Sequence, residues 1–93
     1  MSGKTINRPN VSRQSRAEAL AFVASELKRR IAEKGAGAFA SSHEISGIMT
    51  EEYQEFLEAV HVGDRLEIEA ELADIAVTAI FGLASIHGEH LDW

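Results

Sequence analysis

Apolar residues recur at helical spacing in three stretches of the chain, and each stretch lies between recognisable start and stop signals. The expected caps and stops are, in chain order, Ser12 or Ser15 to Gly35, Ser41 or Ser42 to Gly63, and Asp64 to Gly88. The predicted helices therefore cover about residues 13–34 or 16–34, residues 43–62, and residues 65–86 or 65–87. The pattern predicts an all-α fold, a bundle of three main helices per chain.

The third helix is apolar on two sides, whereas the first two each carry one apolar stripe. The stripes are Ala17, Leu20, Ala21, Ala24, Leu27 and Ile31 in the first helix and Ile45, Ile48, Met49, Phe56 and Val60 in the second. In the third helix they are Ile68, Leu72, Ile75, Ala79, Leu83 and Ile86, with Ala70, Ala73, Val77, Phe81 and Ala84 on the other side. A helix that is apolar on both sides is buried on both sides.

Three helices cannot easily cover such a helix within one small chain. We therefore expect oligomerisation, as a homodimer or homotetramer, to complete the bundle. On this interpretation Phe81→Glu breaks the oligomer. Gly82 is unfavourable inside a helix, so it predicts a close crossing with another helix.

The chain has 93 residues, enough for one small domain, which we expect over residues 13–93 after a flexible N-terminal arm over residues 1–12. It has no cysteine, which excludes disulfides and thiolate metal sites. The start of the chain is polar and basic rather than signal-like, and the longest uncharged run, residues 75–86, is too short to span a bilayer. A cytoplasmic protein without a membrane partner is expected.

Charge is divided unevenly along the chain. Residues 1–34 hold eight of the nine basic side chains and three acids, and residues 35–93 hold the other twelve acids and one basic side chain. The net charge of −6 argues against nucleic acid as the main partner, since a phosphate backbone requires a basic face. The second half is instead suited to a cation, and Lys34 in the first half is a candidate to bind ligand phosphates.

Two acidic motifs lie on the second and third helices. Glu51, Glu52 and Glu55 form E-E-x-x-E, and Glu71 and Asp74 form E-x-x-D. Acids three residues apart lie on one flank of a helix, about 60° apart. The short connection after the second helix makes an antiparallel hairpin, which brings Glu52 and Glu55 opposite Glu71 and Asp74.

Four converging carboxylates repel one another, and a hard divalent cation such as Mg²⁺ relieves that repulsion. Glu52 also falls in the middle of the apolar stripe, where a carboxylate is costly unless it is paired or metal-bound. A structural ion pair is the alternative explanation, but only one basic residue, Arg65, follows Lys34. That shortage favours a metal site whose natural ligand is a nucleoside polyphosphate.

The motif pair in this helix–turn–helix setting resembles the all-α nucleoside triphosphate pyrophosphohydrolases, the superfamily of MazG proteins, dimeric dUTPases and phosphoribosyl-ATP pyrophosphatases. The resemblance covers roughly residues 15–88. It implies that Glu52, Glu55, Glu71 and Asp74 bind Mg²⁺, or Mn²⁺ as a substitute, and that Glu51 orients or deprotonates the attacking water. It also implies hydrolysis of an NTP or dNTP between the α and β phosphates, giving a monophosphate and pyrophosphate.

Other interpretations remain open. The substrate of such a hydrolase is alternatively phosphoribosyl-ATP. Glu58 and His61 form one E-x-x-H, the motif of di-iron bundles, but those sites require two such motifs and Glu58 is expected to point mostly away from the bundle. A non-enzymatic helical interaction module, with its acids as a solvated face, is the third alternative.

Overall fold

The structure is a computed structural model that describes residues 7–91. It contains three α-helices: α1 (Arg13–Lys34), α2 (Ser42–Val62) and α3 (Arg65–His87). With Ser12 rather than Ser15 as the first cap, these bounds agree with the sequence-based expectation to within one residue, and the all-α prediction is confirmed. Of the expected flexible arm, residues 1–6 lie outside the described part, and residues 7–12 are exposed and non-helical.

Local capping determines where each helix begins and ends. Ser12, Ser41 and Asp64 are the N-caps, and each side-chain oxygen accepts hydrogen bonds from backbone N–H groups of the following turn. Gly35 and Gly63 end α1 and α2 at φ +84°, a left-handed value that glycine adopts without steric cost. The chain therefore reverses direction within two residues between α2 and α3.

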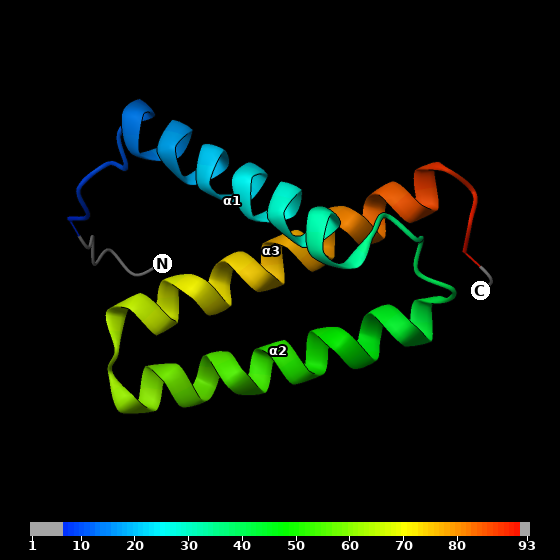
Figure 1. Ribbon diagram of the computed structural model, residues 1–93. Helices are drawn as coiled ribbons and strands as arrows, with labels where there is room; N and C mark the ends of the chain where they lie inside the picture. Colours follow the sequence, from blue (N-terminus) through cyan, green and yellow to red (C-terminus); the bar gives the residue numbers. More distant parts are fainter. Residues whose placement is uncertain (1–6, 92–93) are drawn as a thin grey trace, which may run out of the picture.

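Helix α3 is the centre of the bundle. It packs along α2 as an antiparallel hairpin and is crossed by α1, which runs in the same general direction as α3 (Figure 1). Gly82 of α3 lies against Ile45 of α2, where an added Cβ would be 3.3 Å from Ile45 Cδ1. The close crossing expected at Gly82 is confirmed.

Phe39, in the segment between α1 and α2, packs edge-on against Phe81 of α3 with ring centroids 5.3 Å apart. Phe81, expected on the face that contacts another subunit, is half-buried and has this neighbour within its own chain. A charge at Phe81 would therefore disturb the fold itself. The apolar face that remains open on α3 includes Leu72 and Leu83, which are 50% and 58% exposed.

The apolar stripe predicted for α1 is only partly correct. Leu27 and Ile31 are half-buried as expected, but Ala17, Leu20, Ala21 and Ala24 are exposed. The contact flank is rotated toward Val23, Leu27 and Arg30, because α1 meets α3 obliquely and mainly through its C-terminal half (Figure 1). No residue of α1 is fully buried.

By length and composition α3 could cross a membrane: its most apolar stretch has a mean hydropathy of 1.4. The central helix of a bundle has the same composition, and α3 packs on both α1 and α2. Only 28% of that stretch is buried inside the chain, which leaves an apolar face for a further contact.

The Gly82 crossing predicts a coupled response to substitution. We expect Gly82→Val to lower the melting temperature by several degrees, because the added side chain meets Ile45. Ile45→Ala should then lower the stability less in the Gly82→Val background than in the wild type. A double-mutant cycle by thermal unfolding measures this difference. Gly47→Val is the matched control, since nothing lies within 4 Å of its added Cβ. Equal losses at Gly47 and Gly82 would contradict the prediction.

Candidate functional site

An acidic hollow of about 420 Å³ opens between α2 and α3 near their connection. Its lining residues are Glu55, Glu58, Ala59 and Val62 from α2, Asp64 from the turn, and Glu67 and Glu71 from α3. Glu58, which was expected to point mostly away from the bundle, is exposed and lies along the wall of this open hollow. The hairpin thus gathers carboxylates from both helices around one open space.

Glu52 is the buried carboxylate of α2. It is 7% exposed, and its Oε2 accepts a hydrogen bond of 3.0 Å from Thr78 Oγ1 of α3. Its Oε1 is buried without a hydrogen-bond partner. Burial raises the pKa of Glu52 above its usual value; the Thr78 hydrogen bond and the charge of Arg30 oppose this increase, and the charge of Asp74 adds to it.

Glu71 is the corresponding carboxylate of α3. Its Oε1 is also buried without a hydrogen-bond partner. Burial raises the pKa of Glu71, and the neighbouring charges of Glu55, Asp74, Glu67 and Glu52 raise it further. The four acids predicted as metal ligands are therefore close enough to influence one another, as the antiparallel hairpin implied.

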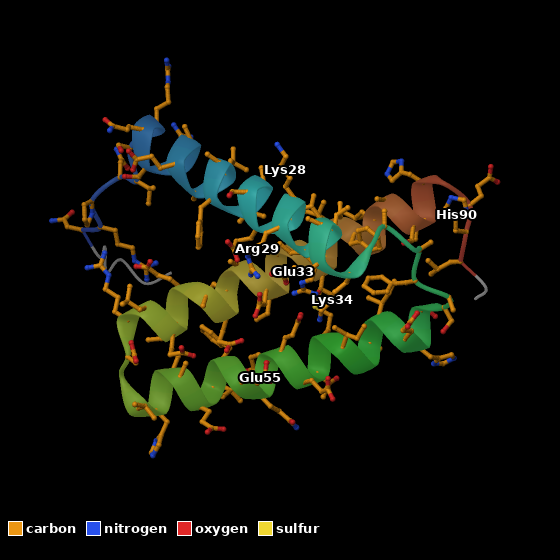
Figure 2. The ribbon with its side chains drawn as sticks, viewed as in Figure 1. Lys28, Arg29, Glu33, Lys34, Glu55 and His90 are labelled. Atoms are coloured by element: carbon orange, nitrogen blue, oxygen red, sulfur yellow. The ribbon has the colours of Figure 1, made fainter. Side chains whose placement is uncertain are left out.

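The remaining two predicted site residues lie at its margins. Glu51 is exposed on α2, one position before Glu52. Lys34 is exposed at the end of α1, on the side that faces α2, and Lys28 points away (Figure 2). Lys34 lines a smaller hollow of about 130 Å³ together with Arg30, Phe39 and Phe81.

Arg30 of α1 is the residue that sequence reasoning did not assign to the acids. Its Nη2 lies 3.7 Å from Glu52 Oε2 and 3.5 Å from Asp74 Oδ1. The counter-charge comes from an earlier helix, so the scarcity of basic residues after Lys34 does not exclude an ion pair for Glu52. In the sequence, the indication that Arg30 lies near the site was its position four residues before Lys34, on the same flank of α1.

The donor set fits a hard divalent cation, because every candidate ligand is a carboxylate oxygen and two of these oxygens have no hydrogen-bond partner. As arranged in residues 7–91, however, no three acidic or histidine side chains are gathered closely enough to hold an ion. Arg30 lies between two of the four candidates, Glu52 and Asp74.

Fold and site together define a class of protein: a helical bundle built on a hairpin whose facing helices carry E-x-x-E and E-x-x-D. A family model, the MazG nucleotide pyrophosphohydrolase domain, matches residues 40–91, which is more than half of the chain. The chain belongs to this family. The match contains α2, α3 and all four candidate ligands, whereas α1 lies outside it. Comparisons with curated proteins and with solved structures find no match.

The environment of Glu71 predicts a stability cost at neutral pH. Because folding raises its pKa, the folded state holds the proton more tightly than the unfolded state, whose carboxyl titrates near pH 4.5. The stability from this group is therefore complete below about pH 4.5 and is lost as the pH rises through the folded-state pKa. In chelator-containing buffer, we expect Glu71→Gln to melt close to the wild type at pH 4 and a few degrees higher at pH 7.

The control for this prediction is Glu69→Gln on the same helix. Glu69 pairs with Arg65 at 3.0 Å on the exposed surface, so its removal should give no gain that grows with pH. A lower melting temperature for Glu71→Gln at pH 7 would contradict the prediction.

Proposed function

We propose that this protein is a divalent-metal-dependent pyrophosphohydrolase that cleaves an NTP or dNTP between its α and β phosphates. One observation carries the proposal beyond family membership: Glu52 and Glu71 each present a buried carboxylate oxygen that has no hydrogen-bond partner within residues 7–91. A buried, unsatisfied carboxylate is costly, and such groups concentrate at functional sites. The products would be a nucleoside monophosphate and pyrophosphate.

Glu52, Glu55, Glu71 and Asp74 would hold Mg²⁺, with Mn²⁺ as a substitute. When bound, the ion would supply a positive charge that neutralises the phosphate oxygens and makes the phosphorus more electrophilic. Thr78 keeps Glu52 oriented through the hydrogen bond to Oε2. Thr78 thus orients one of the four proposed ligands, Glu52, through a residue of the facing helix.

Glu51 is proposed to accept the proton of the attacking water. It precedes Glu52 in the sequence but is exposed, so its carboxylate can contact water, whereas Glu52 is buried. The water oxygen bonds to phosphorus as the anhydride bond breaks, and the bridging oxygen leaves with the pyrophosphate. Lys34 lies at the end of α1, where its ammonium group can bind the distal phosphates.

A second candidate function is a non-enzymatic helical interaction module. The observation in its favour is the Arg30 contact with Glu52 and Asp74, which compensates part of the buried charge without a metal. Thermal unfolding with and without Mg²⁺ or Mn²⁺ separates the two functions. Protection by the metal supports the hydrolase, since ligands that bind the folded state stabilise it.

Product analysis tests the proposed reaction. Incubation with a panel of NTPs and dNTPs plus Mg²⁺ should yield pyrophosphate and monophosphate from the wild type. Glu52→Gln should reduce the rate by at least about a hundredfold, because it removes a ligand charge from the site. Glu69→Gln, with the same charge change on the exposed side of α3, should retain wild-type activity. Release of orthophosphate alone would refute the proposal, and turnover of phosphoribosyl-ATP alone would identify the alternative substrate.

Self-association, as a homodimer or homotetramer, is proposed for the apolar faces that one chain leaves open. Leu72 and Leu83 are three turns apart on one side of α3, and Tyr53, Leu57 and Val60 share a face of α2 by their spacing. All five side chains are about half exposed, between 47% and 58%. Apolar patches of this kind mark contact surfaces.

The oligomer proposal predicts different results for two neighbouring substitutions. Leu83→Glu should lower the mass in solution measured by light scattering, because it charges the open face while leaving the inner packing unchanged. Phe81→Glu should mainly lower the melting temperature, because its ring packs on Phe39. A monomeric wild type, or an unchanged mass for Leu83→Glu, would refute the interface.

A further inference from the structure

Arg30 connects all three helices at the candidate site. Its guanidinium extends from α1 to Glu52 of α2 and Asp74 of α3, with Nη2 at 3.7 and 3.5 Å from their oxygens. Its neighbour Arg29 instead pairs with Glu26 and Glu33 on its own helix, at 2.7 and 3.1 Å. Among the basic residues at the end of α1, Arg30 is therefore the one whose ion pairs reach the acids of the other helices.

The Arg30 contacts compensate charge but satisfy the carboxylates only in part: Nη2 donates a long hydrogen bond of 3.5 Å to Asp74 Oδ1 and lies 3.7 Å from Glu52 Oε2. Charge-assisted hydrogen bonds between guanidinium and carboxylate are typically about 2.7–2.9 Å, and both Arg30 distances are longer. Glu52 Oε1 remains without a partner, as does Glu71 Oε1. A single positive charge thus lies beside a group of acids whose charge it compensates only in part.

A divalent ion and this guanidinium cannot occupy the same oxygens. Two cations a few ångströms apart in a partly buried site repel by several kcal/mol at an effective dielectric constant of about 20. An ion bound by Glu52 and Asp74 therefore displaces Arg30 from them.

We propose that Arg30 is a built-in counter-cation, which holds Glu52 and Asp74 until a divalent metal replaces it. The proposal rests on the metal site of the proposed function. It adds that metal binding releases a guanidinium beside Lys34, in the hollow of about 130 Å³ that both residues line. A guanidinium binds phosphate oxygens in a two-pronged geometry, so the released Arg30 can bind the polyphosphate.

Two consequences follow. Arg30 weakens the binding of metal alone, because the ion must first displace it. Arg30 also makes the binding of metal and of nucleotide cooperative, since the nucleotide gives the displaced guanidinium a new partner. Such coupling is reciprocal, so each ligand raises the affinity for the other. Arg30 lies in α1, outside the family-matched residues 40–91, so this property belongs to the part of the chain that the family match does not cover.

The test compares Arg30→Met with Arg29→Met, which removes the same charge one residue away without touching Glu52 or Asp74. Isothermal titration with Mn²⁺ alone should show about tenfold tighter binding for Arg30→Met, because the competing cation is gone, and wild-type affinity for Arg29→Met. In chelator Arg30→Met should melt below the wild type, and saturating Mn²⁺ should abolish the difference. The α,β-methylene analogue of ATP should tighten Mn²⁺ binding less in Arg30→Met than in the wild type.

Arg30→Lys keeps a cation at this position and guards against a folding defect in Arg30→Met. It should bind Mn²⁺ with an affinity between those of the wild type and Arg30→Met. Equal or weaker Mn²⁺ binding by Arg30→Met, with normal binding by the wild type, would overturn the counter-cation role and leave the hydrolase proposal intact. Absence of Mn²⁺ binding in every variant would overturn both.

Discussion

The arrangement of this small bundle depends on the presence of several carboxylates within a largely apolar helix hairpin. Glu52 is buried between α2 and α3, and Glu71 has a buried oxygen on the facing helix. Each carboxylate loses hydration and meets the charge of the others, so both pKa values are raised. Such carboxylates require a compensating positive charge if they are to remain ionised. In the structure Arg30 of α1 supplies part of that charge, and within residues 7–91 Glu52 Oε1 and Glu71 Oε1 have no hydrogen-bond partner.

This requirement explains why α1 belongs to the site although it buries little apolar surface. No residue of α1 is fully buried, and its N-terminal half diverges from α3 (Figure 1). Its C-terminal half, in contrast, brings Arg30 and Lys34 to the acids and to the neighbouring hollow. The α2–α3 hairpin therefore contributes the acids of the candidate site, and α1 contributes the positive charge beside them.

The sequence predicted the helix bounds and the clustering of the acids well, because both depend on short-range rules. Ser12, Ser41 and Asp64 cap the turns that follow them, and glycine ends α1 and α2 wherever the rest of the chain lies. The spacing of Glu71 and Asp74 on one flank, opposite Glu52 across a short turn, required only helical geometry. The family match confirms the resemblance that was based on this motif pair.

The sequence by itself thus determined three helices, an acidic hairpin and a tight crossing at Gly82. Only the tertiary structure decided that Arg30 pairs with Glu52 and Asp74, that Phe81 packs inside the chain, and that Leu20 remains exposed. The physical reason is that these three outcomes depend on how each helix is rotated about its own axis and tilted against its neighbours. That rotation is set by the sum of many weak contacts between helices, and no local spacing in the sequence records it.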